Sequence, residues 1–187
     1  SDINVNGLTV GKGTNAVSTN TALGVSALAS GSLSGDLNIA IGSNTLSNNT
    51  TGYRNVGLGA YALQYNTTGY ENTATGRNAL ENNTTGYRNV ASGSYSLMDN
   101  STGYSNTANG FASMYENTTG YENTTSGRGS LANNTSGSTN TALGFYSMVN
   151  STTGSSNTVV GHESLRTNTT GSQNTVFGKQ AGYSNST

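Results

Sequence analysis

"NTTGYENTATGRNALENNTTGYRN", residues 66–89, contains its own first five letters again before it ends. The motif Asn-Thr-Thr-Gly-Tyr begins at Asn66 and returns at Asn83, 17 residues later. Its glycine position recurs at the same interval, so that nine copies run without insertion from Gly35 to Thr187. A fixed, short period is the sequence signature of a repeat architecture, in which each unit packs on its neighbours.

The remaining residues divide the chain into two regions. Residues 17–34 form an earlier, looser copy with one extra residue, and residues 1–16 stand outside the register. We therefore predict an N-terminal capping or joining segment at 1–16 and a repeat domain at 17–187. The repeat domain consists of the irregular first coil 17–34 and nine coils at 35–187.

The composition is poor in large apolar residues and also poor in charge. Leu, Ile, Val and Phe make up only 29 of 187 residues, but the net charge is −1 and 8% of residues are charged, so the high charge typical of disorder is missing. Amide-rich and hydroxyl-rich chains can order through stacked hydrogen bonds instead. The scattered basic residues argue against nucleic acid as a partner. Cysteine is absent, and no apolar run approaches the roughly 20 residues needed for membrane insertion.

The fixed positions of the repeat indicate a β-solenoid. With the glycine as position 1, position 4 is Asn and position 8 is Gly in all nine copies, and position 12 is Leu or Met in eight. Two glycines per unit would cost a helix about 1 kcal/mol each. In a β-solenoid each unit is one coil, and equal positions stack about 4.8 Å apart. The predicted fold class is all-β, a β-solenoid (β-roll) of about ten coils forming a rod of about 48 Å.

Two short strands per coil fit the unit: positions 3–7, as in Glu71–Thr75, and positions 9–13, as in Arg77–Glu81. They would form two sheets about 10 Å apart. The position-4 amides are predicted to hydrogen-bond from coil to coil as a structural ladder. Its members are Asn38, Asn55, Asn72, Asn89, Asn106, Asn123, Asn140, Asn157 and Asn174.

A coil of this size encloses little apolar material, mostly Ala and Leu, so we expect a further source of stability. Without Cys, and with the single His162, oligomerisation is that source. Positions 5 and 7 form a second, partly apolar stripe that includes Ile39 and Ile41, and position 7 turns polar in the middle copies. Neighbouring strand positions face opposite ways, so one stripe fills the coil and the other meets a partner chain. The pattern leaves open which stripe does which.

Several short phrases resemble known fibre repeats. "NTALGVSAL" (Asn20–Leu28), "NTALGFYSM" (Asn140–Met148) and the recurring "NTTG" resemble repeats of phage tail-fibre and bacterial surface fibre proteins. "NIAIG" (Asn38–Gly42) is similar to the head repeats of trimeric autotransporter adhesins, whose unit is shorter. The resemblance covers residues 17–187. It implies a homotrimer of side-by-side or intertwined β-rolls, located outside the cell, at the cell surface or on a virion.

Position 2 holds a run of tyrosines in five consecutive copies, followed by serines. Stacked at strand spacing, the rings would form an aromatic ladder. The simpler interpretation is stacking that stabilises the coils; the alternative is a surface-contact strip for glycans or for lateral packing. The run consists of Tyr53, Tyr70, Tyr87, Tyr104 and Tyr121.

Two other features have mainly structural interpretations. Position 3 alternates in charge at Arg54, Glu71 and Arg88, which favours attraction between coils worth about 0–1 kcal/mol per exposed pair. The Asn-x-Ser/Thr sequences match the acceptor pattern for glycosylation, but turn chemistry explains them more simply. Examples begin at Asn49, Asn66, Asn83 and Asn117.

Catalysis has little support in the sequence. Acid–base chemistry needs a positioned His or a pair of carboxylates, and Glu163 beside His162 is expected to point the other way along a strand. Asp99 and Glu116 share position 14 and can approach the roughly 5 Å separation of retaining glycosidases, yet a regular rod offers them no pocket. We expect no enzyme, cofactor or metal site.

Three functions remain. The first is a non-enzymatic structural fibre protein, a rigid extracellular or virion shaft or adhesin segment. The second is the subunit of an extracellular filament that assembles end to end. The third is a glycan-binding or ice-binding solenoid, although threonines at positions 5 and 7 pair only at Thr73 and Thr75. The expected partners are further copies of the chain and, secondarily, surface glycans.

Overall fold

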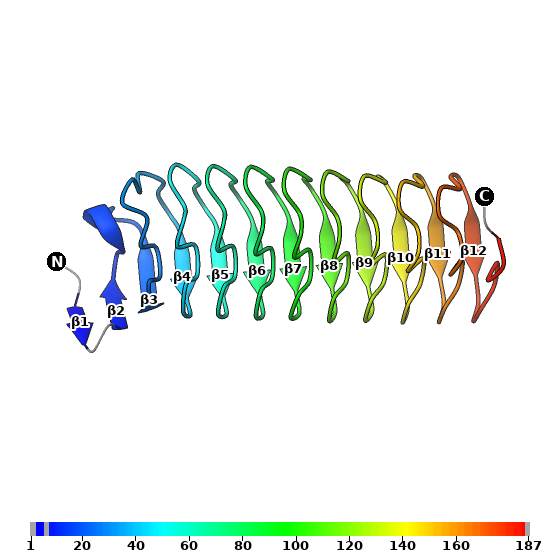
Figure 1. Ribbon diagram of the computed structural model, residues 1–187, viewed down its shortest axis with the longest axis horizontal. Helices are drawn as coiled ribbons and strands as arrows, with labels where there is room; N and C mark the ends of the chain where they lie inside the picture. The colour runs from blue at the N-terminus through cyan, green and yellow to red at the C-terminus, as the bar shows by residue number, and fades with distance from the viewer. Residues whose placement is uncertain (1–2, 6–7, 186–187) are drawn as a thin grey trace.

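The computed structural model describes residues 3–5 and 8–185. Residues 1–2, 6–7 and 186–187, which include the predicted end of the last repeat at Thr187, lie outside the described residues. The described chain winds into one elongated column of stacked coils, with the strands side by side from one end to the other (Figure 1). This confirms the all-β β-solenoid with 17-residue coils. Within the described ranges, no helix is long and apolar enough to cross a membrane.

The strands form a single sheet in sequence order. From β3 onward neighbouring strands are parallel, and from β4 onward each residue pairs with its equivalent 17 residues later, as Ile39 does with Val56. The step from β3 to β4 is 18 residues, Thr21 to Ile39, which accommodates the extra residue of the first coil. The elements are β1 (Ile3–Val5), β2 (Leu8–Gly11), the short 3-10 helix η1 (Thr14–Ala16), β3 (Thr21–Val25), β4 (Ile39–Ile41), β5 (Val56–Leu58), β6 (Thr73–Thr75), β7 (Val90–Ser92), β8 (Thr107–Asn109), β9 (Thr124–Ser126), β10 (Thr141–Leu143), β11 (Thr158–Val160) and β12 (Thr175–Phe177).

The N-terminal segment adds two antiparallel strands to one edge of this sheet. β1 pairs with β2, and β2 pairs with β3 with Leu8 opposite Val25. An open sheet edge exposes unpaired N–H and C=O groups. The segment predicted to cap or join the repeats therefore covers the β3 edge of the parallel strands.

The predicted second strand at positions 9–13 is wrong, and so is the prediction of two sheets. These positions form turns, and their residues at positions 10 and 12, such as Tyr61 and Leu63, have φ of 64° and 53°. Positive φ is incompatible with an extended strand. The first strand is also shorter than predicted, at positions 5–7, because position 3 has positive φ, as at Arg54 with 54°.

The turns nevertheless stack in register, like the strands. The Tyr61 N–H donates to the Ser43 carbonyl at 2.8 Å, and the Leu63 N–H donates to the Ala79 carbonyl at 3.0 Å. A non-glycine residue with positive φ costs about 1–2 kcal/mol. Hydrogen bonds between coils offset that cost, as does the burial of Leu63, which is 0% exposed. Each coil thus has one strand wall and one turn wall.

The core is a narrow column between these two walls. The middle residue of most strands, such as Ala40, is buried, while its neighbours Ile39 and Ile41 point outward. The structure thereby decides that positions 6 and 12 fill the coil and that positions 5 and 7 face outward. The largest buried apolar side chains are Leu28, Leu33, Leu46, Leu63, Leu80, Leu97, Met114, Leu131, Met148, Leu165 and Val159.

Close approach of the backbone explains the two invariant glycines. At position 8, Gly76 has a φ of 131°, and a Cβ there would lie 2.6 Å from the carbonyl carbon of Gly93. At position 1, a Cβ on Gly86 would lie 2.4 Å from the Gly103 carbonyl oxygen and 2.3 Å from Asn83 Oδ1. Coils at sheet spacing therefore leave no room for a side chain at either position.

Gly86→Ala is expected to destabilise the protein by about 3 kcal/mol, because the added methyl meets rigid backbone and a buried amide. Urea unfolding followed by circular dichroism measures the change. Gly31→Ala is the matched control, since a Cβ at Gly31 meets nothing within 4 Å. Equal stability of the two variants would contradict this account of the invariant glycines.

Candidate functional site

The position-4 asparagines lie in one row along the column. In each step the side-chain Nδ2 donates to Oδ1 of the preceding asparagine at 2.9 to 3.2 Å. The same Oδ1 accepts the backbone N–H of the next asparagine, as Asn72 Oδ1 does from Asn89 at 3.0 Å. All nine predicted residues, Asn38 to Asn174, belong to this row, which begins one coil earlier at Asn20.

A second amide ladder, at position 15, was missed by the sequence analysis. Here Nδ2 donates to the preceding Oδ1 at 2.7 to 2.8 Å, as between Asn83 and Asn66. The signal was present, because position 15 is Asn in eight of nine copies. The Asn-x-Ser/Thr residues considered above, Asn49, Asn66, Asn83 and Asn117, belong to this ladder and are 0% exposed. Their amide nitrogens are hydrogen-bonded inside the fold.

Both ladders converge on the glycine at position 1. The Gly86 carbonyl oxygen accepts from Asn72 Nδ2 at 2.9 Å and from Asn83 Nδ2 at 3.0 Å. Two amide donors thus hold one carbonyl oxygen, and each amide is also joined to its equivalents in neighbouring coils. A buried network of this kind stabilises a fold when every member is satisfied.

The position-15 ladder is interrupted at Ser151. At this break Asn134 Oδ1 and Ser151 Oγ are buried and have no hydrogen-bond partner, and the same holds for Asn168 Oδ1 at the later step toward Asn185. Each buried polar group left unpaired costs about 1–3 kcal/mol. The serine hydroxyl is too short to replace the amide that links neighbouring coils elsewhere in this row.

Ser151→Asn is expected to raise the free energy of unfolding by about 1–2 kcal/mol. The new amide would donate to Asn134 Oδ1 and the Gly154 carbonyl oxygen, and would accept from Asn168 Nδ2. Thermal and urea unfolding measure the gain. Ser126→Asn, at an exposed outward position of β9, is the control and should leave stability unchanged. If Ser151→Asn stabilises the protein no more than Ser126→Asn does, the explanation is wrong.

The position-2 tyrosines form a continuous stack on the outside of the rod. Neighbouring ring centroids are 4.9 to 5.0 Å apart and the ring planes differ by 3° to 6°. The guanidinium of Arg54 lies 5.6 Å from the Tyr53 centroid. The structure thus joins all five predicted residues, Tyr53, Tyr70, Tyr87, Tyr104 and Tyr121, in one strip. Contact of this strip with glycans or other chains stays a prediction.

The charged residues beside this strip form a chain of ion pairs. Glu71 lies between two arginines, 3.2 Å from Arg54 Nη1 and 3.0 Å from Arg88 Nε. Hydrogen bonds from Arg88 first, and then from Arg54, lower the pKa of Glu71 below its ordinary value of 4.5. These exposed contacts link three successive coils and are screened by salt.

Stability should therefore fall in acid. Because folding lowers the pKa of Glu71, the ionised carboxylate contributes to the free energy of unfolding above about pH 4.5. This contribution is lost as the pH falls through the pKa of the folded state. Urea titrations between about pH 7 and about pH 3 measure this loss. Glu71→Gln should show a smaller decrease over that range, and high salt should reduce the difference; identical pH profiles would contradict the ion-pair assignment.

His162 and Glu163 lie together, contrary to expectation. They occur in the turn wall, and His162 Nδ1 is 3.8 Å from Glu163 Oε2. Alternation along a strand does not apply there, and Glu163 has a φ of 51°. Glu163 also pairs with Arg166 and accepts from Gln180 Nε2 at 3.0 Å. Among the described residues, no group of three His, Cys, Asp or Glu side chains is arranged to hold a metal ion.

The outer face of the sheet is apolar where it begins. Pairing places Ile3, Val10, Leu23 and Ile41 in one row across β1 to β4. The outer aliphatic patch comprises Ile3, Leu8, Val10, Leu23, Val25, Ile39 and Ile41, which are 38% to 63% exposed. Exposed patches of this kind, without charge, are typical of protein interfaces.

No protein-family model, curated protein or solved structure matches this chain. Its function is therefore inferred from the amide ladders, the tyrosine strip and the exposed surfaces.

Proposed function

We propose that this protein is a non-enzymatic structural fibre protein, a rigid rod segment that works outside the cell or on a virion. The observation that carries the proposal is the pair of buried amide ladders running along the column. Each coil repeats the hydrogen bonds of its neighbours, so the repeats together form a long and stiff column. Such a column suits a shaft that holds another part of a particle at a distance.

We also propose that copies associate side by side as homotrimers through the outer aliphatic patch. The core of each coil is thin, and the patch presents seven large aliphatic side chains and no charge. Burial of apolar surface stabilises association by roughly 25 cal/mol per Å² before the costs of association are subtracted. From β6 to β9 the outward residues are mainly Thr, Ser and Asn, so the contact would be strongest near the N-terminal end.

Sedimentation velocity and negative-stain microscopy test both parts. A side-by-side trimer should have three times the 19.0 kDa mass of one chain and keep that mass on dilution. An end-to-end filament, the alternative, should lengthen as concentration rises. A compact monomer with no rod-like particles would reject the fibre and filament functions together.

Ile41→Asp is expected to shift the assembly toward monomer, because it places a carboxylate within the outer aliphatic patch. Ser126→Asp is the matched control: both residues occupy position 7 and face outward, but Ser126 lies on the polar part of the face. Light scattering after size-exclusion chromatography gives the mass of each variant. An unchanged assembly in Ile41→Asp, or equal loss in both variants, would exclude this patch as the interface.

A further inference from the structure

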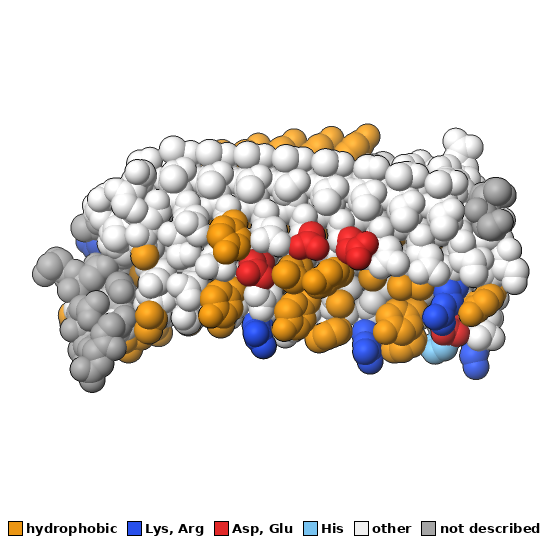
Figure 2. Space-filling view, in the orientation of Figure 1, with side chains coloured by type: hydrophobic (Ala, Val, Ile, Leu, Met, Phe, Trp, Pro, Cys, Tyr) orange, Lys and Arg blue, Asp and Glu red, His pale blue; other side chains and the backbone are white. Residues whose placement is uncertain are grey.

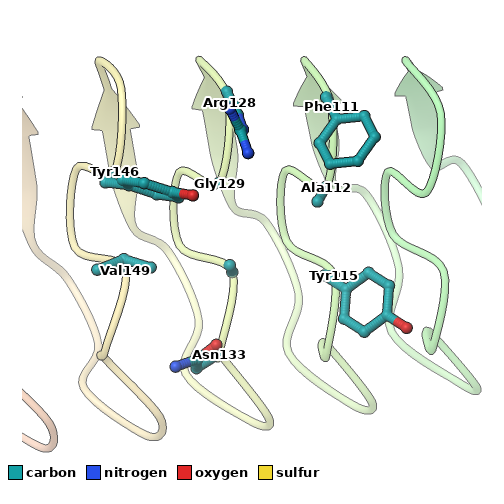
Figure 3. Close-up of a pocket in the computed structure, with 9 residues that line it drawn as sticks. Phe111, Ala112, Tyr115, Arg128, Gly129, Asn133, Tyr146 and Val149 are labelled. Atoms are coloured by element: carbon teal, nitrogen blue, oxygen red, sulfur yellow. The ribbon is translucent and has the colours of Figure 1, made fainter.

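The turn wall contains an aromatic hollow of about 350 Å³ (Figure 3). Its lining comes from positions 9, 10, 13 and 14 of three successive repeats. Phe111 and Tyr115 lie on one side, and Tyr146 and Val149 on the other. The lining residues are Phe111, Ala112, Tyr115, Arg128, Gly129, Ala132, Asn133, Tyr146 and Val149.

Small residues in the middle repeat create this hollow. Gly129 occupies position 10, where the flanking repeats carry Ala112 and Tyr146, and Ala132 occupies position 13, where they carry Tyr115 and Val149. The two flanking repeats are therefore two coils apart, so their backbones are separated by about 9.6 Å. The Tyr146 ring extends over Gly129, where an added Cβ would lie 2.3 Å from its Cε1 atom (Figure 3). The hollow that remains lies beside Ala132, between the Tyr146 ring and the side chains of Phe111 and Tyr115.

Opposite charges flank the hollow. Arg128 at position 9 lies 5.5 Å from the Phe111 ring centroid and 5.8 Å from that of Tyr146, and it has no ion-pair partner in the described parts of the chain. Glu116 at position 14 directly follows the lining residue Tyr115, and Asp99 occupies the same position one repeat earlier, where it accepts from Asn82 Nδ2 at 2.8 Å; neither has an ion pair in the described residues. In Figure 2, acidic side chains follow the upper margin of a hydrophobic band and basic ones follow much of its lower margin.

This arrangement selects against a charged ligand. An anion attracted to Arg128 would also meet the negative charge of Glu116 beside Tyr115, and a cation attracted to Glu116 would meet the positive charge of Arg128. Burial, followed by the charges of Asp99 and Glu116, raises the pKa of Tyr115. Hydroxyl groups both donate and accept, so an uncharged polyol satisfies the guanidinium and the carboxylates together. The C–H face of a sugar ring also complements the electron-rich face of an aromatic ring.

We propose that the hollow binds a neutral pyranose unit of a polysaccharide, with the ring between Tyr115 and Tyr146. Arg128 and Asn133 supply hydrogen bonds to its hydroxyls, with Glu116 accepting at the margin. The site is separate from the tyrosine strip at position 2 and from the outer aliphatic patch. It goes beyond the proposed fibre function and does not depend on it, because a rod without this site would still be a rod.

Saturation-transfer difference NMR on the whole protein tests the proposal with cellotriose and maltotriose as neutral probes. Trigalacturonate and the trimer of glucosamine are the anionic and cationic probes. For the better neutral sugar we expect a Kd on the order of 1 mM, a common range for a shallow, open site. Each charged trimer should bind at least about fivefold more weakly because of the flanking like charges. No saturation by either neutral sugar, or a preference for a charged trimer, overturns the proposal.

Variants locate the site. Tyr146→Ala removes a wall and should weaken binding about tenfold. Ala132→Met fills the hollow with the residue that position 13 carries at Met98, and should likewise weaken binding, without removing an aromatic ring. Tyr61→Ala, at position 10 outside the hollow, is the matched control and should bind like the unmodified protein. If both hollow variants retain affinity, or Tyr87→Ala in the tyrosine strip alone loses it, the hollow is not the site.

Discussion

The carbonyl oxygen of the first glycine in each repeat, held between two asparagine amides, is the contact on which the rest of this structure depends. Asn72 and Asn83 hold Gly86 in this way, and each also bonds to its equivalents in neighbouring coils. The contact requires glycine, because a Cβ would occupy the space of the amide and of the next carbonyl. Since the same geometry recurs in most repeats, the spacing of coils is fixed by buried hydrogen bonds more than by the volume of the core.

Hydrogen-bonded spacing explains how a chain with so few large apolar residues forms an ordered column. The inward positions hold a narrow file of Leu, Met and Ala, and the turn wall accepts non-glycine residues at positive φ. Both would be unfavourable in an isolated coil. Stacked coils offset them, because each turn donates and accepts in register with the next. The interruption at Ser151 is confined to the position-15 row, because the position-4 ladder continues past it from Asn140 to Asn157 and Asn174.

Outward positions are released from this constraint, and their side chains differ from coil to coil. Five repeats carry the tyrosine strip, the first strands carry the outer aliphatic patch, and small residues at Gly129 and Ala132 open the hollow. Each surface lies at different repeat positions or in different coils. A scaffold that fixes only the inward and glycine positions therefore leaves room for self-association on the strand wall and ligand contact on the turn wall.

The sequence alone determined the period, the solenoid class, the Asn38–Asn174 ladder and the row of tyrosines, because identical residues at a constant interval must stack when coils have equal length. It did not determine that positions 9–13 form turns. Leu63 and Tyr61 are residues that favour strands or helices, and their positive φ is stable only with hydrogen bonds from adjacent coils. The inward role of Ala40, the second ladder at Asn83 and the hollow beside Arg128 likewise depend on which side of the backbone faces the column. Only the closed coil decides that, because burial is a property of the stack and not of the single repeat.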